Sequence, residues 1–332
     1  MTSVPACTVR RTYRASPLEL SWLDDIARNA SVCKRVRAER LSVVQHWLAL
    51  SVAWQNGTRT GDTWPRNVFS HIELEDTCAP DAPAVTIPLE PLYGFLRHPL
   101  HACVKRWGVI TTKDHLVMPL GSEMLQPRRP GARRPRALYF DLGASSYLSG
   151  MGGSSMNWFV ETYERHGIGF DEVHAWEAKR SRSPMHGAPQ GMREATRFYN
   201  GVPVNSSAGA LHNPLRLLGE RASEADFVVL KMDFDQPAME DELLAQLLAS
   251  PRLISLVDEL FYEQVATGNA LVSMGPWKQA VGPFRGQGAA ARGLAIKRDR
   301  SNPTDATVVS LAESFALFSR LRALGIRAHS WV

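Results

Sequence analysis

Short apolar runs separated by helical patterns fill the chain from residue 137 onward. Runs at 137–140, 172–177 and 227–232 have the length of a strand, and each ends at or just before an acidic residue. Strands covered on both faces read as such near-continuous apolar runs, as in parallel sheets. The pattern therefore predicts an α/β fold with a doubly wound, mostly parallel, Rossmann-like sheet whose ligand sites lie at the carboxyl ends of the strands.

Helices and loops are expected between these runs. One helix should begin near Ser154 or Ser155 and end at residues 166–167. A second should begin near Pro237, with acids in its first turn, and stop before Pro251. The remaining expected elements are a loop at 178–194, strands at 196–204, 256–263 and 326–332, a long lid or binding loop at 275–302, and a helix that opens at 302–303.

The first part of the chain has a weaker pattern. Helical spacing extends from residue 17 to 53, and short strand-like pieces occur at 109–112 and 115–118. We therefore expect a mainly helical or irregular N-terminal region at 1–126, which either caps a substrate cleft or serves as an attachment module. Alternating Pro and Arg at 127–136 predict a solvated linker, and 137–332 form the α/β domain.

Charge and cysteine usage narrow the partners. The net charge of +5 is modest, and no aromatic residue interleaves the arginines of the linker, so a nucleic-acid partner is not expected. No apolar stretch reaches the length of a membrane span. The spacing of Cys7, Cys33, Cys78 and Cys103 fits neither a redox pair nor a tight zinc site. These are either unpaired thiols of a cytoplasmic protein, the default, or disulfides of a secretory-pathway protein. Sequons at Asn29, Asn56 and Asn205 are compatible with the second reading.

Candidate ligand contacts follow the first two runs. Asp141 and Gly143 stand at the end of the first run, and glycine allows both a sharp turn and close approach of a ligand. Glu177 ends the second run, where a carboxylate can accept two hydrogen bonds from ribose hydroxyls. Glycine does not recur at the G-x-G-x-x-G positions of dinucleotide-binding folds, so a pyrophosphate group is not the expected ligand.

These motifs resemble a family. Phe140-Asp141-Leu142-Gly143-Ala144 resembles the first motif of class I S-adenosylmethionine-dependent methyltransferases, and Glu177 resembles their acidic residue at the end of the second strand. Residues 229–235, with Lys231, Asp233 and Asp235, are similar to the lysine-x-aspartate-x-acid segment of FkbM-type methyltransferases, and residues 200–204 resemble their asparagine-bearing third strand. Gln236 stands where that family usually has glycine, Glu240 matches a displaced family glutamate, and the first motif lacks its second and third glycines.

The resemblance implies S-adenosylmethionine as cofactor and a hydroxyl of a small molecule or sugar as methyl acceptor. The cofactor contacts it implies are Asp141, Gly143, Ala144, Ser145, Glu177 and Asn200. A hydroxyl acceptor needs a group that takes its proton, for which Asp233, Asp235 and Glu263 are the candidates. In an extended segment Asp233 and Asp235 would point to the same face. No metal ligands are nominated.

Two other functions stay open. Asp233-Phe234-Asp235 has the D-x-D form with which metal-dependent glycosyltransferases hold a metal and a sugar diphosphate. A non-catalytic relative that keeps the fold as a binding module would explain the missing motif glycines. Lys231 within an apolar strand requires a partner, which nearby acids can supply, whereas His174 is expected in the core.

Overall fold

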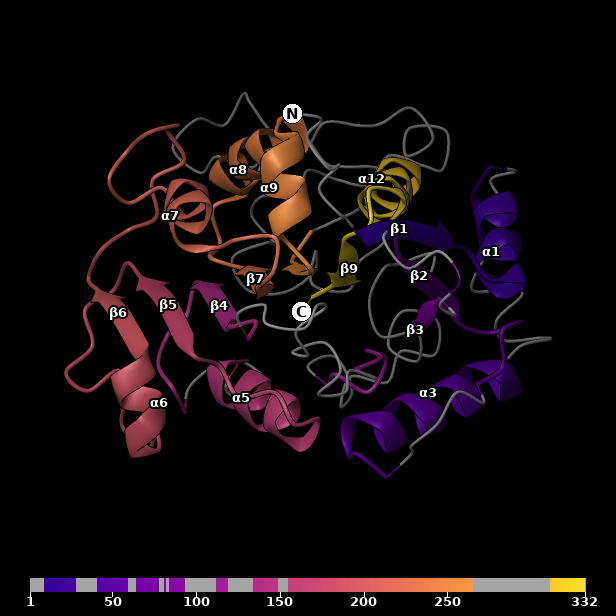
Figure 1. Ribbon diagram of the computed structural model, residues 1–332, viewed down its shortest axis with the longest axis horizontal. Helices are drawn as coiled ribbons and strands as arrows, with labels where there is room; N and C mark the ends of the chain where they lie inside the picture. The colour runs from indigo at the N-terminus through magenta and orange to yellow at the C-terminus, as the bar shows by residue number, and fades with distance from the viewer. Residues whose placement is uncertain are drawn as a thin grey trace, which may run out of the picture.

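The computed structural model describes residues 9–27, 41–58, 64–77, 81, 84–92, 112–118, 134–148, 155–264 and 311–331. Its centre is a six-stranded sheet in the order β6-β5-β4-β7-β8-β9 (Figure 1). All its described strand pairs are parallel. The strands are β4 (Ala137–Leu142), β5 (Glu172–Glu177), β6 (Thr196–Asn200), β7 (Phe227–Met232), β8 (Glu259–Tyr262) and β9 (Arg327–Ser330). The predicted α/β fold with a mostly parallel sheet is confirmed.

Helices cover both faces of this sheet because alternate strand residues are apolar on each side. On one face Phe140 and Leu230 belong to an apolar cluster that includes Leu243 and Phe318. On the other face Tyr139 packs in a second cluster that includes Phe159. The helices that follow β4 are α5 (Ser155–Arg165), α6 (Gln190–Ala195), α7 (Pro214–Arg221), α8 (Pro237–Ala249), α9 (Pro251–Leu256) and α12 (Leu311–Ala323).

The N-terminal region contains the predicted helices and three strands that the pattern did not predict. Helices α1 (Pro17–Ala27) and α3 (Leu41–Gln55) match the helical spacing at 17–53. Strands β1 (Val9–Arg14), β2 (Ser70–Asp76) and β3 (Val85–Leu89) form an antiparallel sheet. The apolar pattern does not mark the first two because they are rich in charged residues. These residues pair across the strands, as Arg14 does with Glu73 at 3.1 Å.

Some boundary predictions were wrong. Residues 115–118 are irregular rather than a strand, since side chains take their carbonyl groups: Gln55 Nε2 donates to the Leu116 carbonyl at 2.7 Å. The predicted strand at 256–263 begins only at Glu259, because helix α9 runs through Leu256. The predicted loop at 178–194 ends in helix α6. Helices α5 and α8 begin and end where predicted, and Gly167 has a φ of +76° after α5.

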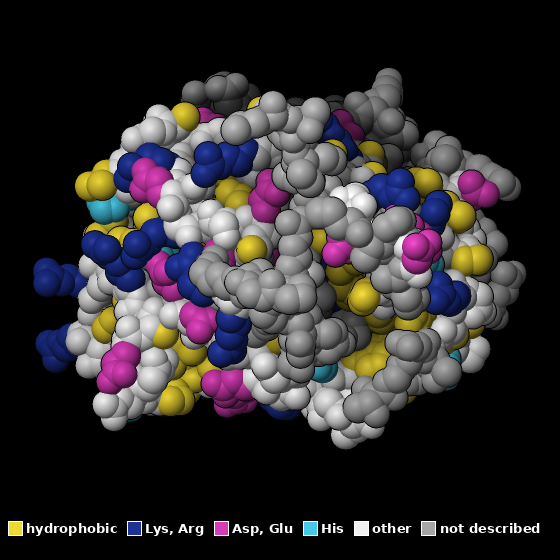
Figure 2. Space-filling view, in the orientation of Figure 1, with side chains coloured by type: hydrophobic (Ala, Val, Ile, Leu, Met, Phe, Trp, Pro, Cys, Tyr) yellow, Lys and Arg dark blue, Asp and Glu magenta, His cyan; other side chains and the backbone are white. Residues whose placement is uncertain are grey.

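Several predictions fall outside the described residues. They concern the four cysteines, residues 109–111, most of the linker, and the loop at 275–302, and the domain division also stays a prediction. None of the helices in the described part of the chain is long and apolar enough to cross a membrane. Figure 2 shows acidic and basic side chains interspersed across the face that it draws.

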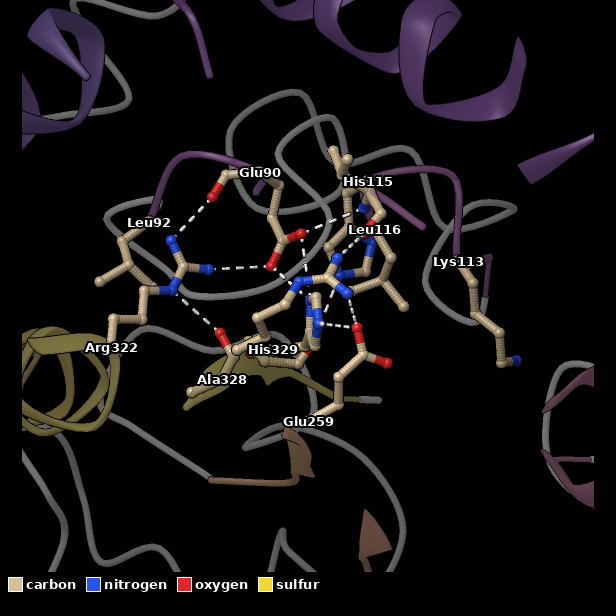
Figure 3. A network of polar contacts seen from close by, with 12 residues as sticks. Glu90, Leu92, Lys113, His115, Leu116, Glu259, Arg322, Ala328 and His329 are labelled. Atoms are coloured by element: carbon tan, nitrogen blue, oxygen red, sulfur yellow. Dashed lines mark hydrogen bonds and ion pairs between the residues drawn. The ribbon is translucent and has the colours of Figure 1, made fainter. Parts of the chain in front are cut away.

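A buried ion-pair network joins the N-terminal region to helix α12 and strand β9 (Figure 3). Arg322 of α12 donates from Nη2 to Glu90 Oε1 at 2.9 Å and from Nη1 to the Glu90 carbonyl at 2.8 Å. Its Nη1 also lies 3.4 Å from Glu19 Oε2. His329 Nδ1 contacts Glu90 Oε1 at 2.9 Å. Arg322 and His329 are fully buried, so the Arg322 guanidinium, and the His329 imidazole when it is protonated, depend on these carboxylates.

The network continues onto strand β8. The Glu259 carboxylate pairs with Arg327 and accepts from the Tyr163 hydroxyl. The backbone N–H of Val117 donates to Glu90 Oε2 at 3.1 Å, and its carbonyl accepts from Arg327 Nη2 at 3.3 Å. The N-terminal region therefore packs on β8 and β9 through charged groups as well as through apolar contacts.

Replacing Arg322 by Met should lower the free energy of unfolding by about 3–5 kcal/mol, because the buried Glu19 carboxylate loses its ion pair and Glu90 keeps only His329 as a charged partner. Urea denaturation measures this change. The matched control is Arg320→Met on the same helix, where the side chain is exposed and the change should stay within about 0.5 kcal/mol. Equal losses in the two variants would contradict the role given to the network.

The network also predicts a pH dependence. Burial alone would raise the pKa of Glu90. His329, Arg322 and the Val117 N–H have the larger combined effect and lower this pKa from 4.5 to about 2. Ionised Glu90 thus contributes stability above pH 4.5 that is lost as the pH falls toward 2. Burial lowers the pKa of His329, but the Glu90 and Glu259 carboxylates raise it above 6.5. Its contribution is present below pH 6.5 and is lost as the pH rises through the folded-state value.

Urea unfolding measured as a function of pH tests both predictions: the loss of stability at acid pH that Glu90 causes and the loss at higher pH that His329 causes. Glu90→Gln should abolish most of the loss of stability at acid pH and reduce the loss at higher pH, because it removes the negative charge on which both depend. Glu161→Gln, at an exposed position of α5, should leave the profile unchanged. A Glu90→Gln profile that is parallel to that of the wild type would refute this account.

Candidate functional site

The carboxyl ends of four neighbouring strands bring most of the nominated residues to one edge of the sheet. Leu142 of β4 is in register with Trp176 of β5 and with Met232 of β7. Met232 is in turn in register with Tyr262 of β8. The residues that follow these four positions are therefore aligned along the edge: Gly143, Glu177, Asp233 and Glu263. The strand order reverses between β4 and β7, and ligands of open α/β sheets bind at such a point.

Gly143 is required by the close approach of two turns. Its φ is +87°, and an added Cβ would lie 1.8 Å from the carbonyl oxygen of Asp233. Its N–H donates to the Trp176 carbonyl at 3.1 Å. The predicted sharp turn is confirmed, but the backbone that follows β7, at Asp233 and Phe234, is what crowds this glycine.

Glu177 ties down the turn that follows β4. Its Oε2 accepts from the Ser145 N–H at 3.0 Å and its Oε1 from the Lys179 N–H at 2.7 Å. Ser145 has a φ of +53°, and the buried Ala144 donates its N–H to Trp176 at 2.9 Å. Each carboxylate oxygen keeps a further lone pair, so Glu177 can hold the turn and still accept from a ribose.

Asn200 fixes the loop after β5. Its Oδ1 accepts from the Ser181 N–H and its Nδ2 donates to the Ser181 carbonyl, both at 2.8 Å. This reciprocal pair fastens the loop to the end of β6. The nominated asparagine therefore shapes the edge beside Glu177, and its assignment as a cofactor contact stays a prediction.

Asp141 and Lys231 form a fully buried ion pair at 3.0 Å. Lys231 Nζ also donates to the Gly143 carbonyl at 3.1 Å and lies 3.5 Å from Asp233 Oδ2. Burial alone would lower the pKa of Lys231, but the two carboxylates raise it above its ordinary value. The expected acidic partner of Lys231 is confirmed. Asp141 holds this lysine inside the sheet.

The two aspartates after β7 do not form the predicted pair. The chain leaves the strand after Met232, and Asp235 is exposed with a left-handed φ of +58°. The period-two alternation that would place both carboxylates on one face therefore fails. Asp233 is partly buried and its Oδ2 accepts from the Trp331 indole N–H at 2.9 Å.

Two further acids lie close to this turn. Glu263 is buried, and its N–H donates to the Met232 carbonyl at 3.0 Å, which places it beside Asp233 at the edge. Glu240 in the first turn of α8 is also buried and accepts from the Phe234 N–H at 3.0 Å. Burial raises its pKa to about 8, so its carboxyl is protonated at neutral pH. In the sequence, Glu240 is recognisable as an acid in the first turn of the helix predicted near Pro237.

Lys113 is a candidate site residue that the sequence pattern does not mark. It comes from the irregular segment at 112–118 and is only 6 % exposed. Its Nζ lies 5.0 Å from the ring centroid of Trp331 and 5.8 Å from that of Trp158. Burial, with Lys231 nearby, lowers the pKa of Lys113 to about 8. No local pattern marks such a residue, because the fold alone brings it to the edge.

Among the described residues, no group of three or more His, Cys, Asp or Glu is placed to hold a metal ion. His174 is buried, contacts Glu172 Oε1 at 2.7 Å and stacks on Phe140, so its predicted place in the core is confirmed.

Comparisons with protein-family models, with curated proteins and with solved structures found no match. What the site can do chemically is therefore inferred from its own residues.

Replacing Gly143 by Ala should lower the free energy of unfolding by at least about 1–3 kcal/mol, because the left-handed backbone is strained and the Cβ overlaps the Asp233 carbonyl. Thermal and urea unfolding measure the loss. Gly191→Ala in α6 is the control, since nothing lies within 4 Å of its added Cβ and alanine favours the helix. A Gly143→Ala protein as stable as the wild type would disprove the close approach.

Proposed function

We propose that this chain is a Rossmann-like, S-adenosylmethionine-dependent methyltransferase acting on a hydroxyl of a small molecule or carbohydrate. One observation carries the proposal. At the reversal of strand order, the glycine turn after β4 lies beside an acid at the end of β5, and Glu177 bonds to that turn through Ser145. In the dinucleotide-binding members of such folds, a carboxylate at this position hydrogen-bonds a ribose hydroxyl.

The residues fit the demands of methyl transfer. The cofactor supplies an activated methyl group, and the protein must hold an acceptor oxygen in line with it and exclude water. Glu177 would accept from the ribose hydroxyls, and the turn at 143–145 would lie along the cofactor. Asp233 and Glu263, at the ends of β7 and β8, would orient the acceptor.

Asp233 fits this role better than that of a metal ligand. Its Oδ2 already accepts from Trp331, and the Lys231 ammonium lies 3.5 Å away. A divalent cation on this carboxylate would be repelled by that ammonium. The D-x-D reading also needs Asp235 on the same side, and the left-handed turn at this residue breaks the alternation. We therefore place the glycosyltransferase reading second.

Glu177→Ala should weaken S-adenosylmethionine binding by about 1.5–3 kcal/mol, the loss expected when a hydrogen bond to a charged group is removed. Isothermal titration calorimetry without added metal measures the affinity, and melting temperature checks the fold. The control is Glu194→Ala, at an exposed position of α6. The wild type should bind S-adenosylhomocysteine that lacks the ribose 2′-hydroxyl more weakly than S-adenosylhomocysteine itself, by a similar free energy. In the Glu177→Ala protein, removal of this hydroxyl should cause little further loss of affinity.

Three results would overturn the proposal. Unchanged affinity in a folded Glu177→Ala protein would remove the ribose contact. Binding of UDP-glucose with manganese but not of S-adenosylmethionine would favour the glycosyltransferase. Silence toward both ligands would favour a binding module, whose Glu177 serves only to fasten the turn.

A further inference from the structure

Lys113 is held in place by a segment with little freedom to move. Its carbonyl accepts from Gln55 Nε2 at 2.6 Å, and the His115 carbonyl accepts from Trp47 Nε1 at 3.2 Å. Val117 is fixed from both sides by Glu90 and Arg327. In Figure 3 the Lys113 side chain points away from this network. An irregular segment fastened in this way presents its lysine at a fixed position.

The position it reaches is the carboxyl edge of the sheet. Its ammonium lies over Trp331 of the β9 end and Trp158 of α5, and Trp331 donates to Asp233. Asp233 already has the Lys231 ammonium beside it. Lys113 is thus a second buried cation in the field of the Asp233 carboxylate.

The charges that face Lys113 come from two elements. Burial lowers the pKa of Lys113 most, and Lys231 of β7 lowers it too, whereas Asp233 after β7 and Asp114 of its own segment raise it. With a pKa of about 8, roughly a fifth of the Lys113 side chains are neutral near pH 7.4, and this fraction grows as the pH rises. A neutral amine has a lone pair that can accept a proton. Asp233 Oδ2, by contrast, already accepts from the Trp331 N–H and lies 3.5 Å from Lys231 Nζ.

We propose that Lys113 is the base that takes the proton of the acceptor hydroxyl, an inference that rests on the proposed function. As the oxygen–methyl bond forms, the sulfur–methyl bond breaks and its electron pair stays on sulfur, which becomes a neutral thioether. The hydroxyl proton passes to the neutral Nζ of Lys113, and the resulting ammonium later releases it to water.

This placement can be tested without knowing the acceptor. A base beside the acceptor oxygen also lies near the sulfonium, so charged Lys113 should repel S-adenosylmethionine but not S-adenosylhomocysteine, which lacks the positive sulfur. The sulfonium also lowers the pKa of the ligand's own amine, so the effect of Lys113 is the part of the pH dependence that the substitutions at this residue remove. We expect the affinity ratio of the two ligands to rise about tenfold between roughly pH 6.5 and 9.5, a coupling of one pK unit. Calorimetry of both ligands at each pH measures this ratio.

Two substitutions fix the charge in each state. Lys113→Met should hold the ratio at its high-pH value throughout, and Lys113→Arg should hold it at its low-pH value, because arginine stays charged. Lys179→Met, at an exposed position after β5, should behave as the wild type. Melting temperatures identify a variant that fails to fold. If Lys113→Met fails to fold, the result for Lys113→Arg tests the inference, and the reverse holds if Lys113→Arg fails.

Glu240 titrates in the same range and faces Asp233, so its contribution must be separated. A pH-dependent ratio that survives in Lys113→Met and disappears in Glu240→Gln would overturn the inference, as would equal pH dependence for the two ligands. Failure of both ligands to bind at any pH would instead refute the proposed function.

Discussion

Lys231 holds the two central strands together at the point where the strand order reverses. From β7 it pairs with Asp141 of β4 and donates to the Gly143 carbonyl, and it lies close to Asp233. A buried ammonium is tolerated only with such partners. The Lys231 ammonium thus contacts Asp141 near the end of β4, the turn after β4 at Gly143, and Asp233 after β7. The edge on which a ligand would lie is therefore fixed by a buried charge in the core.

A second set of buried charges fastens the N-terminal region over β8 and β9. Glu90 receives Arg322 and His329 on one side and the Val117 N–H on the other. The segment that carries Lys113 is therefore positioned by the network that stabilises the fold. A loss at Glu90 should reach the edge of the sheet through this segment, so stability and the geometry of the site are coupled.

The edge itself carries groups whose protonation depends on burial. Lys113 and Glu240 both have a pKa of about 8, the first lowered and the second raised by desolvation. The Asp233 carboxylate interacts with both and lies 3.5 Å from Lys231 Nζ. Opposite shifts in neighbouring groups are typical of sites where protons move, and here they arise from elements far apart in the chain.

The sequence by itself determined the parallel sheet and the place of most candidate residues. Apolar runs that end in Asp141, Glu177 and Asp233 predict strands whose carboxyl ends meet, because the run length and the polar residue after it are local properties. The charged strand β1 and the irregular segment of Lys113 carry no such local signal, since cross-strand ion pairs and side chains of α3 determine their conformation. Only the tertiary structure decided that Gly143 is crowded by the Asp233 carbonyl, that Asp235 turns out of the strand, and that Lys113 lies over Trp331. Each of these depends on contacts between segments distant in sequence, which periodicity and spacing do not encode.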